Sequence, residues 1–133
     1  MTANLRSRVR KRARDRCEYC LIPLRHDALP GQLDHVIATQ HGGHTLYRNL
    51  AFACGHCNAH KGPNISGIDY MTKSLVPLFN PREHRWAQHF RYEGARMVGL
   101  SASGCATVNV LAMNHPRRVA LRQDLLDAEL FWE

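Results

Sequence analysis

Four of the five cysteines lie in two pairs with the same spacing. Cys17 and Cys20 form the first pair and Cys54 and Cys57 the second, with two residues inside each pair. This spacing allows both thiolates of a pair to bind one metal ion, and two pairs complete the closed tetrahedral site of structural zinc. Disulfides are the alternative, but they are rare in the reducing interior of a cell, and a redox dithiol would need only one pair. We therefore predict a structural Zn²⁺ site that leaves Cys105 outside.

Four polar residues between and just after these pairs have the chemistry to cut a phosphodiester bond. They are Asp34, His35, Asn49 and Asn58. A carboxylate and an amide oxygen form a hard, oxygen-only partial site suited to Mg²⁺, which also binds phosphate oxygens. A neutral imidazole, with a reference pKa of about 6.5, accepts a proton from water near neutral pH, and an amide carbonyl can fix its ring. Each residue alone is more often a turn carboxylate, a core histidine or a helix cap, but their joint order between two zinc-binding pairs favours catalysis.

The sequence around these residues resembles the HNH endonucleases. The motifs that carry the resemblance are QLDHVI at 32–37, HGG at 41–43, NL at 49–50 and CGHCNAHKG at 54–62. Further matches, to the C-terminal extension of a bacterial subgroup of these enzymes, are LFNPR at 78–82, Trp86, His89, Phe90, Gly104, Ala106 and Thr107. The resemblance implies an α+β fold with a small ββα-metal (His-Me finger) core, in which a strand and a helix hold one catalytic divalent ion.

The resemblance also implies a role for each of the four polar residues. Asp34 and Asn58 would bind Mg²⁺ or Mn²⁺. His35 would be the general base that activates water, with its ring oriented by Asn49. The reaction would be hydrolysis of DNA phosphodiester bonds that leaves 5′-phosphate and 3′-hydroxyl ends. Three positions depart from the family pattern: Asn58 replaces the last histidine, Ala38 replaces a proline, and Cys105 replaces an arginine of the subgroup.

The charge of the chain favours DNA as the partner. The chain has 18 Lys and Arg against 11 Asp and Glu, giving +7. Residues 1–61 hold ten basic and four acidic residues (+6), and residues 62–133 hold eight and seven (+1). A helix that docks through Leu5, Val9 and Ala13 would hold its arginines in fixed positions against phosphates. The alternative is that the basic segment is a solvated tail or binds a membrane surface. The predicted nucleic-acid contacts are Arg6, Arg10, Arg12, Arg14, His41 and Lys61.

The expected architecture is one domain, 1–133, in three parts. A basic helix at 1–16 precedes the zinc-stapled core at 17–62, which ends in a helix that carries Asn58. The extension at 63–133 is predicted to contain helices at 83–89, 105–112 and 115–132 and a hairpin of strands 90–92 and 97–100. No run of about 20 apolar residues occurs, and no apolar segment follows the basic N-terminus, so neither a membrane span nor a secretory signal is expected. We expect a cytoplasmic protein of a bacterium or a phage.

The last predicted helix carries two apolar rows. One row holds Val119, Leu126 and Leu130, and the other holds Leu121, Leu125 and Ala128. Because a single core would use only one row, the second row predicts a protein partner or a second copy of the chain, which makes a homodimer one expectation. Two alternatives to a nuclease remain: a non-catalytic zinc ribbon that binds nucleic acid, and a zinc-stabilised protein-interaction module.

Overall fold

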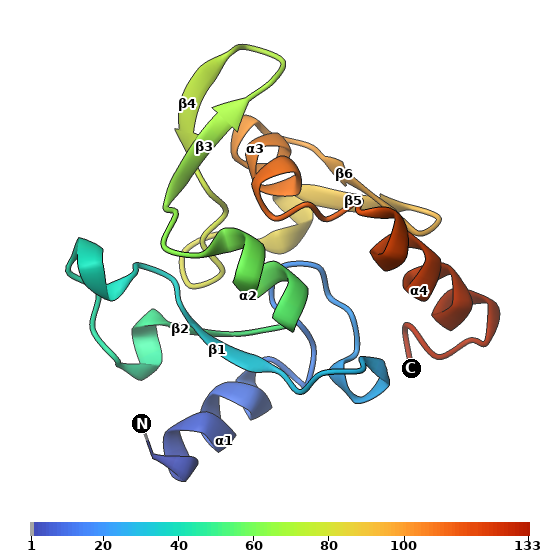
Figure 1. The fold of residues 1–133 in the computed structure, drawn as a ribbon, viewed down its shortest axis with the longest axis horizontal. Coiled ribbons are helices and arrows are strands. Elements are labelled where there is room, and N and C mark those ends of the chain that lie inside the picture. Colours follow the sequence, from blue (N-terminus) through green and yellow to red (C-terminus); the bar gives the residue numbers. More distant parts are fainter. Residues whose placement is uncertain (1) are drawn as a thin grey trace.

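Short helices and strands in about equal measure build the molecule. The computed structural model describes residues 2–133. In chain order the helices are α1 (Ala3–Arg12), α2 (Gly55–Lys61), α3 (Ala102–Val110) and α4 (Pro116–Asp127), and the strands are β1 (Gln32–His35), β2 (Leu50–Ala53), β3 (Ser66–Asp69), β4 (Ser74–Pro77), β5 (Phe90–Glu93) and β6 (Arg96–Gly99). The strands described pair into three two-stranded antiparallel sheets, β1–β2, β3–β4 and β5–β6 (Figure 1). The fold class is therefore α+β, as predicted.

The unit that positions the candidate site is the β1–β2 sheet with α2. The two strands run antiparallel, so that Asp34 lies opposite Ala51 and His35 opposite Leu50. All of β2 is buried, because α1 packs against it while α2 packs against β1. Figure 1 shows α1 below this sheet and α2 above it. The packing fixes the end of β1 relative to α2.

Helix α1 docks through the predicted apolar row. Val9 is buried, and Leu5 and Ala13 are partly buried against the core. The hydroxyl of Thr2 accepts a hydrogen bond from the backbone N–H of Leu5 and caps the first turn. The helix ends at Arg12, earlier than predicted, because the backbone at residues 14 and 15 enters the left-handed region with φ of 56° and 59°. The arginines on α1 are thus held on an ordered helix.

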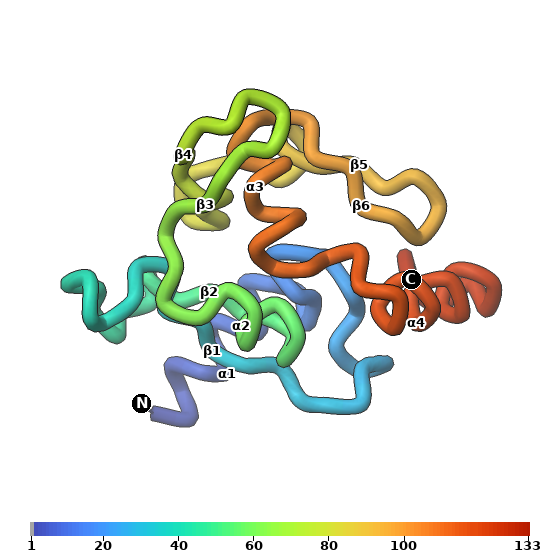
Figure 2. Tube along the Cα trace, turned by 45° about the horizontal axis from the view of Figure 1, so that its top comes forward, coloured from blue at the N-terminus to red at the C-terminus, as the bar shows by residue number. Residues whose placement is uncertain are grey.

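The extension surrounds α3. This helix packs against β3 and β4 on one hairpin and against β6 on the other, and Figure 2 shows it between them, with α4 at the edge of the molecule. The predicted hairpin of β5 and β6 and the predicted helix at α3 are confirmed. On α4, Leu125 is buried and Leu121 and Leu126 are partly buried, as is Leu130 just after the helix. Both apolar rows therefore contribute to packing within the chain. The homodimer stays a prediction, but neither row of α4 is left unused to support it.

Two helices of the extension were predicted with the wrong extent, and one hairpin was missed. The segment 83–89 is not a regular helix and holds only a 3-10 turn at Trp86–Gln88. There the Asn80 side chain accepts from the N–H of Arg82, and the Nδ1 of His84 accepts from the N–H of Asn80, which favours a turn. Helix α4 ends at Asp127 rather than at 132 and is capped by His115. The β3–β4 hairpin was not predicted.

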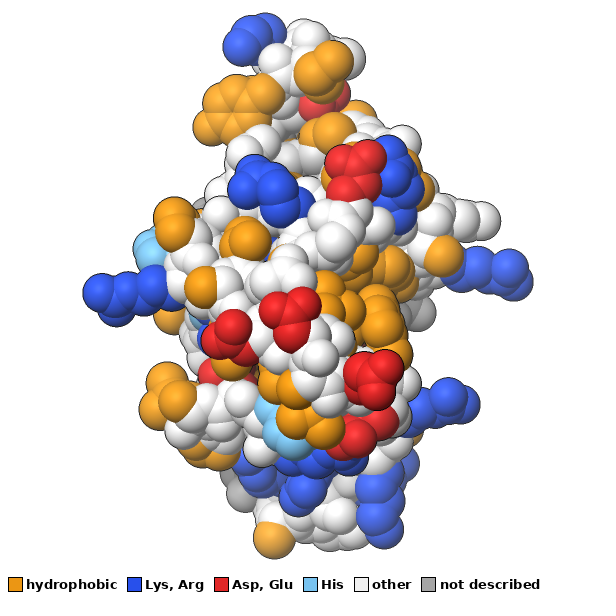
Figure 3. All heavy atoms as spheres, turned by 90° about the vertical axis from the view of Figure 1, so that its right-hand side faces the viewer, with side chains coloured by type: hydrophobic (Ala, Val, Ile, Leu, Met, Phe, Trp, Pro, Cys, Tyr) orange, Lys and Arg blue, Asp and Glu red, His pale blue; other side chains and the backbone are white. Residues whose placement is uncertain are grey.

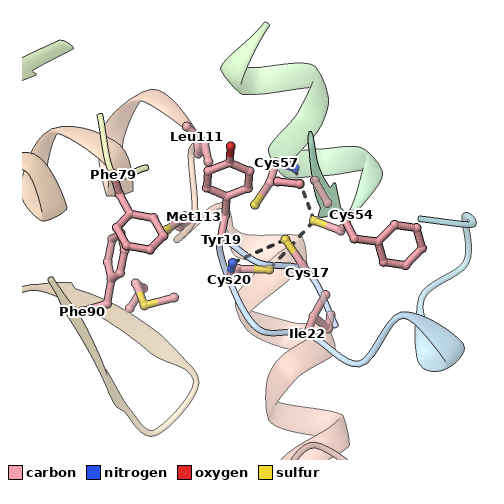
Figure 4. Close-up of a cluster of buried hydrophobic side chains, with 14 of the residues drawn as sticks. Cys17, Tyr19, Cys20, Ile22, Cys54, Cys57, Phe79, Phe90, Leu111 and Met113 are labelled. Atoms are coloured by element: carbon pink, nitrogen blue, oxygen red, sulfur yellow. Dashed lines mark hydrogen bonds between the residues drawn. The ribbon is translucent and has the colours of Figure 1, made fainter. Parts of the chain in front are cut away.

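The core joins the cysteine cluster to the extension. Tyr19, between the first two cysteines, is buried and meets the ring of Phe79 edge-on at a centroid distance of 6.4 Å. Phe79 in turn packs edge-on against Phe90 at 5.1 Å. Figure 4 shows the four cysteines beside Tyr19, with these rings, Leu111 and Met113 on its other side. The two halves of the chain therefore share one core around the first cysteine pair.

Candidate zinc site and candidate catalytic pocket

The four paired cysteines meet at one point in the core. Their Sγ atoms all lie within 4.8 Å of one another, and all four residues are buried. The Sγ atoms of Cys20 and Cys54 are 3.9 Å apart, close to the edge of about 3.8 Å that a tetrahedron with Zn–S distances near 2.3 Å requires. The same distance is far longer than a disulfide bond of about 2.0 Å. The cluster therefore fits a zinc ion, and Cys105 lies outside it as predicted.

Local backbone geometry explains how each pair turns both sulfurs inward. The N–H of Cys20 points to the Sγ of Cys17 at 3.4 Å, and the N–H of Cys57 points to the Sγ of Cys54 at 3.3 Å. Leu21 adopts a left-handed conformation, with φ of 64°, and closes the first turn. The second pair starts α2, with Cys54 at its N-cap. A bound ion would consequently join the loop after α1 to the first turn of α2.

Three of the four predicted catalytic residues line one open pocket. Asp34 and His35 reach it from β1, and Asn58 reaches it from α2. The cavity has a volume of about 280 Å³. Its remaining walls come from residues at the start of the following loop and just after α2: Leu33, Ala38, Thr39, Gln40, Gly62 and Pro63. The ββα unit thus brings a carboxylate, an imidazole and an amide to the same space.

Asn49 holds the loop after β1 instead of the imidazole. Its Oδ1 accepts from the N–H of Ile37 at 2.9 Å, and its Nδ2 donates to the carbonyls of Ile37 at 3.0 Å and His44 at 2.9 Å. The hydrogen-bond partner of the His35 ring is Thr45, whose Oγ1 is 2.8 Å from Nε2. The predicted direct contact between Asn49 and the ring is therefore corrected: Asn49 fixes the loop that presents Thr45. Apart from its place in that loop, Thr45 has no feature in the sequence that would indicate this role.

Asp34 is held by two buried partners. The hydroxyl of Tyr19 donates to its Oδ2 at 2.6 Å, and the Nζ of Lys61 is 3.2 Å from each carboxylate oxygen. Asp34 is 4% exposed and Lys61 is 1% exposed. Burial raises the pKa of the Asp34 carboxyl, and the charge of Lys61 and the hydrogen bond from Tyr19 partly offset this rise. Burial also raises the pKa of the Tyr19 phenol, so the phenol stays protonated and donates.

Two of the predicted nucleic-acid contacts serve the fold. Lys61 is a wrong prediction, because its ammonium group turns inward and also donates to the carbonyls of His35 and Val36. Arg12 donates to the carbonyls of Tyr47 and Leu50, and its guanidinium lies 4.0 Å from the centre of the Tyr47 ring. Both side chains are used to join elements and are not free to bind phosphate.

The remaining predicted contacts are exposed. Arg6 donates to the carbonyl of Gly31 at 2.7 Å and Arg10 pairs with Asp15 at 2.9 Å, yet both side chains reach solvent. Arg14 and His41 are exposed as well. The α4 side carries both signs of charge: Figure 3 shows acidic side chains around an apolar area, with Lys and Arg side chains above and below them. Residues 123–133 include four acidic residues and no Lys or Arg.

Comparison with known proteins identifies the central segment. Residues 17–64 match the model of a family described as HNH endonuclease. No curated protein and no solved structure matched the chain. The matched segment contains both cysteine pairs and all the residues that line the candidate catalytic pocket. Among residues 2–133, no helix has the length and apolarity that crossing a membrane requires.

Proposed function

We propose that the protein is a metal-dependent endonuclease that hydrolyses phosphodiester bonds of DNA. The observation that supports this proposal most directly is the pocket shared by Asp34, His35 and Asn58, within a segment that matches the HNH endonuclease family. A module that only binds DNA has no need for a carboxylate, an imidazole and an amide around one open cavity. The ordered arginines of α1 supply a surface for phosphates beside the same core.

Asp34 and Asn58 would hold the divalent ion, as Mg²⁺ or Mn²⁺. Both offer hard oxygen ligands, and the Oδ1 of Asp34 accepts a single hydrogen bond, from Lys61, which leaves a lone pair for a metal. A cavity of about 280 Å³ has room for an ion with several waters. When bound, such an ion supplies stabilisation of the negative charge that develops on the phosphate and the leaving oxygen.

His35 would act as the general base. When its Nε2 donates to the hydroxyl of Thr45, Nδ1 holds the lone pair that accepts a proton from the attacking water. The half-buried ring lies at the end of β1, where the strand pairs with β2 and Lys61 holds the backbone. The chain therefore holds the base in a defined orientation before substrate binds.

A plasmid-nicking assay tests the function. The zinc-loaded protein should nick supercoiled DNA with Mg²⁺ or Mn²⁺ and not without a divalent ion. His35→Ala should lower the rate by about 10² to 10⁴, the usual contribution of a general base. Zinc content and melting temperature should stay unchanged, since the His35 ring is half-buried and bonds only to a loop hydroxyl. A variant with full activity would remove His35 from the reaction.

A non-catalytic, zinc-stabilised DNA-binding module is the second candidate. The observation in its favour is the Asp34 carboxylate, which already has Tyr19 and Lys61 as buried partners and so has a structural role. The same assay separates the two candidates. DNA binding without nicking under any divalent ion would support the binding module and contradict the nuclease.

A further inference from the structure

Two buried side chains from different parts of the core converge on the Asp34 carboxylate. Tyr19 belongs to the turn between the first two cysteines, and Lys61 is the last residue of α2. Their polar atoms reach the carboxylate at 2.6 Å and 3.2 Å. Asp34 itself also borders the open pocket, so one carboxylate joins the interior of the molecule to the candidate catalytic site.

Tyr19 is fixed at three points. Its ring is fully buried and meets Phe79 edge-on, its carbonyl accepts from the Nε1 of Trp86 at 2.8 Å, and its hydroxyl donates to Asp34. The residues on either side of its turn, Cys17 and Cys20, belong to the zinc cluster. The direction of the Tyr19 hydroxyl is therefore set by the geometry of the first cysteine pair.

Lys61 joins the end of β1 to the end of α2. Besides the carboxylate, its ammonium group reaches the carbonyls of His35 at 3.1 Å and Val36 at 3.2 Å. These contacts use all three of its N–H donors. The same side chain thus holds both the Asp34 side chain and the backbone that carries His35.

We propose that Tyr19 and Lys61 are positioning residues that hold the Asp34 carboxylate for the divalent ion, so that the zinc site sets the geometry of the catalytic site. This inference rests on the proposed function. Groups that hydrogen-bond a metal ligand orient it and tune its affinity for the metal. A buried ion pair contributes little net stability compared with apolar residues of the same size, so stability alone gives a weak reason for placing one here.

The decisive comparison is Tyr19→Phe against Tyr92→Phe. Each variant removes one phenol hydroxyl. The hydroxyl of Tyr19 donates to Asp34, whereas the hydroxyl of Tyr92 donates to the carbonyl of Cys20 in the first cysteine pair. Binding of Mn²⁺ alone to the zinc-loaded protein is measured by calorimetry, together with zinc content and melting temperature. Tyr19→Phe should weaken Mn²⁺ binding by about 10- to 100-fold. Tyr92→Phe should leave Mn²⁺ binding unchanged, and both variants should keep their zinc.

A Lys61 variant supports the comparison but does not decide it. Lys61→Met leaves the buried carboxylate without its charged partner and risks loss of the fold. If this variant folds, its Mn²⁺ affinity should fall at least as far as that of Tyr19→Phe. If it does not fold, the two tyrosine variants carry the test.

The outcomes separate this inference from the proposed function. Equal Mn²⁺ affinity in Tyr19→Phe and the natural protein, with binding lost in Asp34→Asn, would overturn the positioning role and leave the nuclease intact. An equal loss in Tyr92→Phe would overturn the positioning role of the Tyr19 hydroxyl, because the loss would then come from a loosened cysteine turn and not from the missing hydrogen bond to Asp34. Unchanged binding in Asp34→Asn would instead remove the metal site on which the proposed function depends.

Discussion

The reactivity of His35 depends on which ring nitrogen carries the proton. Thr45 is the side chain that bonds Nε2, at 2.8 Å, and it lies in a loop whose two ends are joined by the amide of Asn49. A hydroxyl can accept from an Nε2–H, which leaves Nδ1 free to take a proton. The orientation of the base is therefore set by a loop threonine, and the position of that threonine is set by Asn49.

Replacing Thr45 should lower the rate of cleavage without affecting metal binding. Thr45→Val keeps the shape of the side chain and removes the hydroxyl, so the ring loses the hydrogen bond that holds its orientation. We expect about a 10-fold loss in nicking rate, at the lower end of what a misplaced general base costs. Thr45→Ser should restore most of the rate, while Mn²⁺ affinity should match the natural protein in both variants. A Val variant as active as the Ser variant would contradict the role of this hydroxyl.

At the scale of single residues, the sequence predicts identities better than contacts. The types and order of Asp34, His35 and Asn58, together with the resemblance to the HNH endonucleases, predicted a shared site, and the structure brings all three to one pocket. The burial of Lys61 was not predictable, since a lysine at the end of a short helix is usually solvated. Its contact with Asp34 depends on how α2 crosses β1, a tertiary relation with no counterpart in local sequence.

Among the elements, the two cysteine turns connect parts of the candidate site that are distant in the sequence. They tie the loop after α1 to the first turn of α2, on which Asn58 lies one turn further along. The candidate oxygen site, by contrast, is open to solvent and consists of one carboxylate and one amide. Thiolate ligation of zinc contributes folding free energy, whereas an open oxygen site is needed for turnover only.

Stepwise metal removal should therefore stop cleavage before it unfolds the protein. Brief, mild chelation should abolish nicking with no change in melting temperature, and added Mg²⁺ should restore it. Displacement of zinc by a thiol-reactive mercurial should abolish the cooperative thermal transition, because structural zinc contributes about 10 kcal/mol or more to such small domains. Thermal melting by circular dichroism, alongside zinc analysis, measures both stages. A melting temperature that survives loss of zinc would contradict the structural assignment.

Helix α1 and the turn that follows it, which contains Arg14, should separate into a structural and a DNA-binding part. Arg12→Ala removes two donors to the carbonyls of Tyr47 and Leu50 and the contact with the Tyr47 ring. The free energy of unfolding should fall by about 2 kcal/mol, the usual contribution of hydrogen bonds from a charged group. Arg14→Ala, the matched control, removes the same charge from an exposed side chain and should leave stability unchanged. Urea titration measures both, and equal stability of the two variants would refute the docking role of Arg12.

Helices and strands were predicted correctly where neighbouring residues in the sequence specify them, and were missed where a tertiary contact does. The cysteine turns, the β5–β6 hairpin and the start of α4 were predicted because turn and cap residues specify them locally. The β3–β4 hairpin was missed because its packing depends on a distant residue: a Cβ at Gly67 would lie 2.7 Å from the side chain of Val110 on α3. Gly67 permits a close contact between β3 and α3, whereas a glycine in a sequence usually argues against a strand.

The positive charge of the whole molecule is unevenly distributed. The excess of positive charge belongs to the first half of the chain, on and beside α1, while the α4 side shown in Figure 3 gathers acidic residues around an apolar area. Phosphates would be attracted to the first side more strongly than to the second. DNA bound along α1 would also lie against the unit that carries the candidate catalytic pocket, since α1 packs on β2.

The position of a positive charge, and not only the total, should therefore govern DNA binding. We expect affinity for a short duplex, measured by fluorescence anisotropy without divalent ions, to fall steeply between about 50 and 200 mM salt through release of counterions. Arg14→Ala should reduce the slope of log affinity against log salt by about 1. The control is Arg91→Ala, which removes the same charge from an exposed side chain on β5. Arg91 pairs with Glu93 at 2.9 Å. Strand β5 lies away from α1 in Figures 1 and 2. Arg91→Ala should leave the slope unchanged, because that side chain is remote from the bound phosphates. Equal effects of the two substitutions would mean that net charge alone attracts DNA, and α1 would lose its assignment as the binding face.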